Sequence, residues 1–172
     1  MKYALRLGPG LLGAFVASTT FACGGAPSRA VSPDTSPASG SSGEGAAERC
    51  LASAGARHER RPSEPDRISV KHVLVRYAGS KRSPATVTRT RAQACLRAAE
   101  ALTRLHEGTS FADVVRVYSD ESGAESREGS IGTVERADVA PAFADAAFEL
   151  SIHEVSQVVE TDFGFHVILR VE

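Results

Sequence analysis

The chain has 172 residues, enough for one domain and a tail, and its formal net charge of -1 gives no overall positive field of the kind that attracts nucleic acid. Tryptophan is absent and aromatic residues make up only 6% of the chain. We therefore expect a protein that binds no nucleic acid, with a core built from Leu, Val, Ile and Ala and a few Phe.

The N-terminus has the features of an export signal. Lys2 and Arg6 precede an apolar run over 7–20 that is too short to cross a bilayer comfortably as a permanent helix. The run ends at Thr20-Phe21-Ala22-Cys23-Gly24, which resembles a bacterial lipoprotein signal, in which a small residue precedes the Cys that is lipidated. This resemblance implies a signal peptide over 1–22 and a lipid on Cys23.

Such a lipid would hold the mature protein on a membrane surface of the bacterial cell envelope without spanning the membrane. Gly24, in place of an Asp, is compatible with the outer membrane and its periplasmic face. Cleavage as an ordinary secreted protein is the main alternative, and a permanent transmembrane anchor is a third.

Residues 23–66 form the second expected region. After Cys23 the segment is rich in Gly, Ser, Ala, Pro and charge and almost lacks large apolar residues, so it cannot bury enough surface to offset the entropy of ordering it. We expect a disordered tether with a short helix over 46–56. Cys50 in this region and Cys95 beyond it could pair in an oxidising envelope, but their separation in space does not follow from the sequence.

The folded domain is expected over 67–172. Alternation of apolar and polar residues predicts strands, helical spacing predicts helices, Gly108 and Ser110 separate two helices, and Pro141 opens another. The expected elements are a strand over 68–77, a loop over 78–85, helices over 87–106 and 111–118, an irregular segment over 119–128, a strand over 129–135, a helix from 141, and strands over 155–160 and 163–171. This order predicts an α+β fold with a four-stranded, mostly antiparallel sheet surrounded by helices.

Two strands carry a histidine at the centre. His72 lies in the first strand, and His166 follows Phe163, Gly164 and Phe165 in the last. An imidazole in an apolar, aromatic setting is either a packed core residue or part of a site. No spacing gathers three of the five histidines, and Cys-x-x-Cys is absent, so we expect neither a metal nor a cofactor.

The order and spacing of several motifs resemble the parvulin family of peptidyl-prolyl cis/trans isomerases across 67–172. The motifs are His72-Val73-Leu74-Val75, Phe111-Ala112-Asp113, Tyr118-Ser119-Asp120, Gly129-Ser130-Ile131-Gly132, Pro141-Ala142-Phe143-Ala144-Asp145-Ala146-Ala147-Phe148 and Thr161-Asp162-Phe163-Gly164-Phe165-His166-Val167-Ile168.

The resemblance implies roles for the matching positions. His72 and His166 match two histidines that lie side by side beneath the site. Ile131, Val139 and Phe143 match an apolar cup for the proline ring, and Thr161 and Phe163 match positions on its wall. Glu121 falls where the family has a Cys or Asp, with Asp120 as its competitor for that position.

Two residues depart from the family pattern. Glu121 is longer than Asp, and Glu128-Gly129-Ser130-Ile131 supplies one Gly where the family often has two.

The reaction implied by the resemblance needs no nucleophile. The barrier of about 18–20 kcal/mol between cis and trans X-Pro bonds is amide resonance, which a twist about the C–N bond removes. A catalyst needs an apolar grip on the ring and polar groups that bind the twisted amide better than the planar one. Ser119, Glu121, Thr161 and the two histidines are the polar candidates, with the histidines as organisers of the site. The alternatives are a pair of core histidines and an exposed loop carboxylate.

The loop after the first strand bears on substrate preference. Arg76, Lys81, Arg82 and Pro84 resemble the phosphate-reading loop of parvulins that select phosphoserine or phosphothreonine before proline. Three cations suit a phosphate or carboxylate at that position. A solvated basic loop is the alternative.

The leading interpretation is a prolyl isomerase, acting as a monomer on proline-containing polypeptides, that assists the folding of exported proteins. A non-catalytic chaperone or peptide-binding module is the alternative, and a purely structural envelope lipoprotein is a third.

Overall fold

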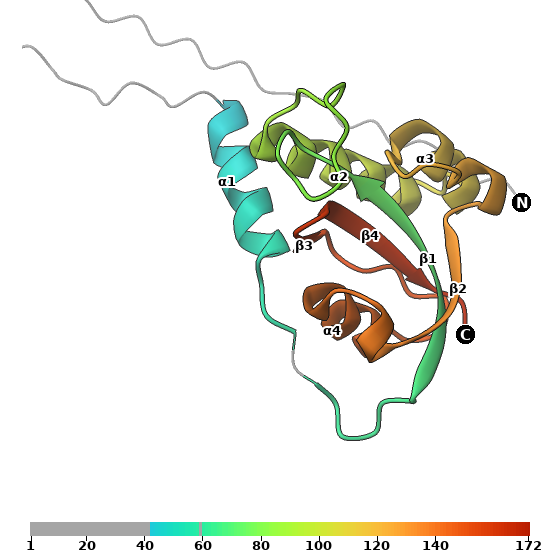
Figure 1. The fold of residues 1–172 in the computed structure, drawn as a ribbon. Helices are drawn as coiled ribbons and strands as arrows, with labels where there is room; N and C mark the ends of the chain where they lie inside the picture. Colours follow the sequence, from blue (N-terminus) through green and yellow to red (C-terminus); the bar gives the residue numbers. More distant parts are fainter. Residues whose placement is uncertain (1–41, 59) are drawn as a thin grey trace, which may run out of the picture. The chain divides into compact units, whose positions relative to one another are not determined.

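A computed structural model describes residues 42–58 and 60–172 (Figure 1). The expected signal peptide, the lipidated Cys23 and the tether up to residue 41 lie outside the described residues. Within the described part, no helix is long and apolar enough to cross a membrane.

The sheet has four strands in the order β2-β1-β4-β3, and every neighbouring pair is antiparallel. The strands are β1 (Arg67–Val75), β2 (Ser130–Glu135), β3 (Val159–Thr161) and β4 (Gly164–Arg170). The helices are α1 (Ser42–Ala54), α2 (Arg91–His106), α3 (Phe111–Tyr118) and α4 (Pro141–Glu149), with short 3-10 turns η1 (Glu125–Arg127) and η2 (Arg136–Asp138). The predicted α+β class and the order of the elements after residue 66 are confirmed.

The two faces of the sheet carry different helices, because successive side chains of a strand point to opposite faces. Val73, Val75 and Phe165 pack with α2 and α3 in one core cluster. Ile68, Val70 and Ile168 pack with α4 in a second cluster on the other face. Figure 1 shows the sheet between α2 and α4. His72 and His166 alternate with the first set and therefore face α4.

The helix predicted over 87–106 begins later, at Arg91. Thr90 accepts a hydrogen bond from the Gln93 backbone N–H, and the Gln93 side chain accepts one from the Thr90 backbone N–H. This reciprocal capping box satisfies N–H groups that have no partner within the helix, so the helix begins after Thr90. Val87 instead belongs to a turn closed onto Pro84.

The strand predicted over 155–160 is also shorter than expected. Val155 makes an isolated bridge to Leu169, and continuous pairing with β4 begins only at Val159. Between them the Ser156 hydroxyl accepts the Ile168 backbone N–H, so a side chain takes the place of a strand partner.

The short helix predicted over 46–56 is present as α1, with bounds four residues earlier at its start and two at its end, whereas the expectation that it belongs to a tether outside the folded domain is wrong. Residues 42–54 form a helix that lies against α2 (Figure 1). A disulfide joins Cys50 to Cys95 with 6.0 Å between their Cα atoms. Ala54 reaches the core between α2 and the sheet and is 4% exposed. The pairing that the sequence left open is therefore present, and it fastens a polar segment that composition alone assigns to disorder.

Candidate active site

The two histidines meet across the centre of the sheet. In the β1–β4 register His72 pairs with Ile168 and His166 pairs with Leu74, which places the two imidazoles diagonally on one face. Their rings lie nearly parallel, at 14° with centroids 5.4 Å apart, and the two Nδ1 atoms are 3.1 Å apart. Both side chains are buried. The predicted histidine pair is thus brought together by strand register.

Phe143 of α4 closes over this pair. Its ring meets His72 edge-on at 5.6 Å and His166 at 5.2 Å, with interplanar angles of 82° and 85°. Pro141 sets the first turn of α4, and Phe143 then lies on the helix face turned to the sheet. The aromatic ring therefore packs against both imidazoles and also lines the neighbouring cavity.

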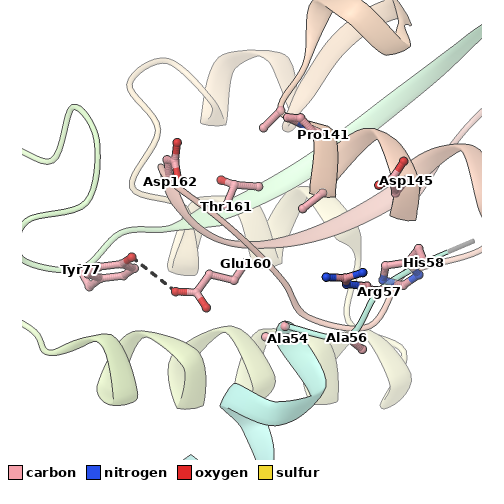
Figure 2. Close-up of a pocket in the computed structure, with 13 residues that line it drawn as sticks. Ala54, Ala56, Arg57, His58, Tyr77, Pro141, Asp145, Glu160, Thr161 and Asp162 are labelled. Carbon is pink, nitrogen blue, oxygen red and sulfur yellow. Dashed lines mark hydrogen bonds between the residues drawn. The ribbon is translucent and has the colours of Figure 1, made fainter.

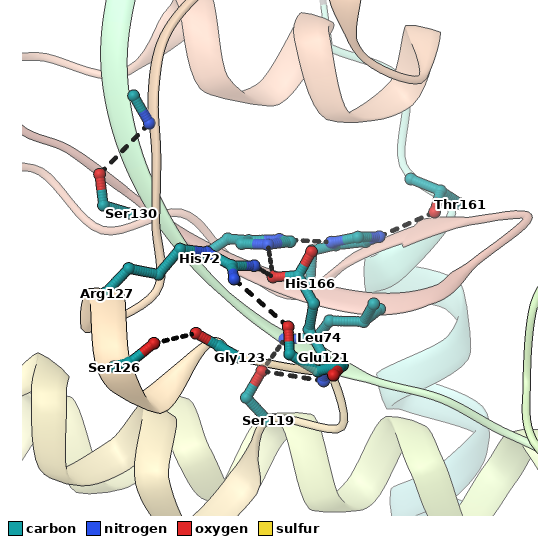
Figure 3. Close-up of polar contacts among 12 residues, drawn as sticks. His72, Leu74, Ser119, Glu121, Gly123, Ser126, Arg127, Ser130, Thr161 and His166 are labelled. Carbon is teal, nitrogen blue, oxygen red and sulfur yellow. Dashed lines mark hydrogen bonds and ion pairs between the residues drawn. The ribbon is translucent and has the colours of Figure 1, made fainter.

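A chain of hydrogen bonds runs through the histidines (Figure 3). The Glu121 carboxylate Oε2 lies 2.9 Å from His72 Nε2 and 2.5 Å from an Arg127 guanidinium nitrogen. At the other end, Thr161 Oγ1 lies 2.8 Å from His166 Nε2 and accepts the Phe163 backbone N–H.

The surroundings of this chain shift the pKa values of two of its groups. Hydrogen bonding to His72, with the charge of His72 and Arg127, lowers the pKa of Glu121 despite the opposing effect of burial. Burial, aided by His72 and Arg76, lowers the pKa of His166 well below 6.5 and keeps that ring neutral. An ionised Glu121 accepts a hydrogen bond from His72 Nε2–H.

The other ring nitrogens also have partners inside the protein. His72 Nδ1 lies against His166 Nδ1, and His166 Nε2 lies against the Thr161 hydroxyl. Every polar atom of the two rings is satisfied inside the protein. All four ring nitrogens are therefore engaged within the protein and none is directed at a bound ligand, which suits a role in orienting their neighbours.

A cavity of about 240 Å³ lies beside this network. Its apolar wall comes from β2, the segment before α4, α4 itself and the β3–β4 turn. The residues that line it are His72, Leu74, Arg76, Arg82, Glu121, Ile131, Asp138, Val139, Ala140, Phe143, Thr161, Phe163 and His166. An apolar wall with a few convergent polar groups is the usual composition of a small ligand site.

The cationic loop stands over Phe163 at the rim. Lys81 Nζ lies 5.0 Å and the Arg82 guanidinium carbon 5.7 Å from the centroid of that ring. Arg76 donates a hydrogen bond to the Lys81 carbonyl, which ties the loop to the end of β1. Arg76 and Arg82 line the cavity, whereas Lys81 lies outside its lining.

Of the two competing acids, Glu121 faces the cavity. Asp120 accepts the Arg76 backbone N–H and forms an ion pair with Arg89, away from the histidines. Ser119 also lies outside the cavity lining, and its hydroxyl accepts the Leu74 backbone N–H at 3.3 Å. Ser119 and Asp120 therefore hold β1 in place and do not reach a ligand in the cup.

Comparisons with known proteins agree with this geometry. The family model described as PPIC-type PPIASE domain matches residues 56–172. The chain belongs to this family. The resemblance to parvulins is thereby confirmed for the folded part, and the match begins before the predicted boundary at Arg67.

Named relatives of this PPIC-type domain include two curated proteins. One is "Putative peptidyl-prolyl cis-trans isomerase dodo" of Drosophila melanogaster, 36% identical over 62% of this chain and 66% of that protein. The other is "Foldase protein PrsA" of Halalkalibacterium halodurans, 42% identical over 42% of this chain and 22% of that protein. The chain spans less than two thirds of the length of both.

A solved structure has the same fold. Peptidyl-prolyl isomerase ESS1 from Candida albicans superposes with a TM-score of 0.58 and 28% identity, covering 62% of this chain and 63% of that one.

Some residues of the site did not follow from the sequence. Arg127, which holds Glu121, comes from the irregular segment after α3, where no periodicity predicts which side chains turn inward. Leu74, Asp138 and Ala140 also line the cavity. Leu74 could have been found from its place two residues after His72 on the same face of β1. Among the described residues, no group of three potential ligands is gathered that could hold a metal ion.

Proposed function

We propose that this protein is a peptidyl-prolyl cis/trans isomerase. The observation that carries the proposal is the position of the apolar cup, walled by Ile131, Val139 and Phe143, directly against the hydrogen-bonded chain from Glu121 to Thr161. Membership of the PPIC-type family supports the same activity.

The cup supplies the grip that the reaction requires. Because the barrier is the loss of amide resonance, holding the proline ring while the preceding residue rotates is enough to define the reaction coordinate. Val139 and Ile131 are partly buried and pack against the α4 core, so they form a wall with little freedom to move. Phe143 is 3% exposed and completes the wall.

The polar chain keeps the cup in one arrangement. Its hydrogen bonds link β1, β4, the segment after α3 and the β3–β4 turn, so the electrostatic field around the bound amide is set before substrate arrives. Groups that are already oriented stabilise a twisted amide without having to reorganise during the reaction. Glu121 and Thr161 are the polar side chains we assign to contact with the substrate, and the two histidines position them.

Exchange spectroscopy by NMR on an Ala-Pro peptide tests the activity. We expect the protein to accelerate cis/trans exchange, and Phe143→Leu to reduce kcat/KM by about tenfold or more, equivalent to ~1.4 kcal/mol of transition-state stabilisation. Phe148→Leu is the matched control, because Phe148 is equally buried in α4 but does not line the cup. Peptide binding without faster exchange would support the non-catalytic peptide-binding module instead.

We further propose that the isomerase prefers an acidic or phosphorylated residue before proline. Arg76 and Arg82 line the cup and Lys81 stands over Phe163, so three cations surround one side of the bound ring. A dianion or carboxylate held there would form charge-assisted hydrogen bonds.

The expected result is a higher kcat/KM on phosphoSer-Pro and Glu-Pro peptides than on Ala-Pro, with the difference reduced in Arg82→Gln. Arg116→Gln, an exposed arginine on α3, is the control. Equal rates on charged and neutral peptides at low salt would contradict the preference.

We propose that the protein assists the folding of exported proteins from the bacterial envelope, held there by a lipid on Cys23. The apolar N-terminal run and the Cys50–Cys95 disulfide, which suits an oxidising compartment, support this location. The mass of the mature N-terminus tests it: a diacylglyceryl adduct on Cys23 is expected, and an unmodified N-terminus would indicate secretion without an anchor.

A further inference from the structure

A second hollow of about 800 Å³ lies beside the proline cup (Figure 2). Its walls come from the end of α1 and the residues after it (54–58), from residues 140–142 where α4 begins, and from residues 160–162 where β3 ends. Ala140 and Thr161 line both this hollow and the cup. The two spaces are therefore neighbours that share a wall.

One wall of the hollow depends on the N-terminal helix. Cys50 binds α1 to α2 through Cys95, and His58 bonds to Glu149 of α4 at 2.7 Å. One attachment precedes the segment 54–58 and the other is made by its last residue, so the segment is held at both ends. The segment that forms this wall therefore stays close to the cup in the folded protein.

The carboxylates around the hollow differ in their partners. Glu160 receives two hydrogen bonds from Arg91, and Asp145 is paired with Arg136. Asp162 is exposed, and none of the cations in residues 42–58 and 60–172 forms an ion pair with it. One unneutralised carboxylate therefore stands at the end of the hollow next to the cup, as Figure 2 shows for Asp162 and Thr161.

The floor of the hollow suits a polypeptide backbone. Pro141 and Ala142 are small or rigid, exposed residues at the start of α4, and Ala56 opposite them is also exposed. Because these side chains are short, an extended client chain can lie close to this surface without displacing any of them.

We propose that this hollow is a subsite for the client polypeptide next to its proline, with a basic client side chain beside Asp162. The proposal rests on the proposed isomerase function, because the client chain would extend from the cup into the hollow across Thr161 and Ala140. Together with the cations over Phe163, it places a negative group, Asp162, next to a positive one, while Arg57 lines the hollow from the 54–58 wall. Substrate selection then depends on charges at two different positions around the proline.

Peptide binding and exchange by the full-length protein test the subsite. A short Ala-Pro peptide reports on the cup alone, and longer peptides carry Lys, Gln or Glu at each position on either side of proline. We expect Lys at one flanking position to tighten binding about two- to fivefold over Gln, the range of an exposed ion pair. Asp162→Asn should remove that gain, while Asp66→Asn, at another exposed aspartate, should keep it.

A steric variant tests the same space independently of charge. Ala56→Phe fills the hollow from the N-terminal wall, so we expect it to weaken the longer peptides and leave exchange of the short peptide unchanged. Ala52→Phe, at an exposed alanine of α1 outside the hollow, is the control.

Each result separates the subsite from the isomerase. If the short peptide is accelerated but neither Asp162→Asn nor Ala56→Phe affects the longer peptides, the subsite is wrong and the isomerase stands. If the short peptide is not accelerated but the Asp162-dependent gain remains, the isomerase is wrong and the subsite stands.

Discussion

His166 is buried as a neutral ring, and this has a thermodynamic consequence. Desolvation, with His72 and Arg76 nearby, lowers its pKa well below 6.5 in the folded protein. Below pH 6.5 the unfolded chain therefore binds a proton at this histidine that the folded protein does not bind. The free energy of unfolding falls as a result. The same sign applies to Glu121, whose lowered pKa adds a further loss of stability below 4.5.

We predict that the free energy of unfolding falls by up to about 1.4 kcal/mol per pH unit below pH 6.5, the value for one proton. Urea unfolding between pH 8 and pH 5 measures this slope, and His166→Gln should flatten it. His106→Gln, at an exposed histidine of α2, should retain the slope. An unchanged slope in His166→Gln would show that another group controls the acid sensitivity.

At the scale of elements, the approach of β2 to β1 depends on a glycine. Gly129 adopts a φ of +76°, its carbonyl accepts the His72 backbone N–H at 2.8 Å, and an added Cβ would lie 2.5 Å from the His72 carbonyl oxygen. Gly132 has the same φ of +76° but nothing within 4 Å of an added Cβ. The two positions separate the strain of a left-handed backbone from the steric conflict with β1.

We predict that Gly132→Ala lowers the free energy of unfolding by about 1–2 kcal/mol through backbone strain alone. Gly129→Ala should cost about 1–3 kcal/mol more, because the chain must also move away from His72. It should also reduce isomerase activity in the fraction that remains folded. Chemical denaturation measures the stability of both variants. An equal loss in the free energy of unfolding would mean that β1 moves away at His72 without an energetic cost.

At the scale of the whole molecule, the disulfide joins the segment before the sheet to the helix that covers one face. Cys50 and Cys95 are 45 residues apart, and Cys95 is fully buried. A cross-link over such a loop restricts the unfolded chain and so stabilises the folded state, by about 2–4 kcal/mol in typical proteins.

We predict a loss of this size in the double variant Cys50→Ser with Cys95→Ser. The same loss should follow when the wild-type protein is unfolded under reducing conditions, and a reductant should have no effect on the variant. Proteolysis within residues 42–58 should become faster in both cases. Equal stability of oxidised and reduced protein would show that α1 stays docked by packing alone.

The sequence by itself determined the strands and helices after residue 66, because periodicity, capping residues and Pro141 are local signals. It also determined the pairing of His72 with His166 and the apolar cup, since these positions matched a family pattern residue by residue. The composition of residues 23–66 predicted a short helix but placed it in a tether outside the folded domain, because the disulfide and the contact with α2 that attach it are long-range interactions.

The tertiary structure alone decided which acid meets the histidines and what surrounds the cup. Glu121 and Asp120 are adjacent in sequence, and only the path of the chain after α3 turns Glu121 toward His72 and Asp120 toward Arg89. Arg127 reaches the site, and the segment 54–58 reaches the hollow beside it, through contacts between parts of the chain that no local pattern connects. Long-range packing sets these positions, and side-chain type and spacing along the chain carry no information about it.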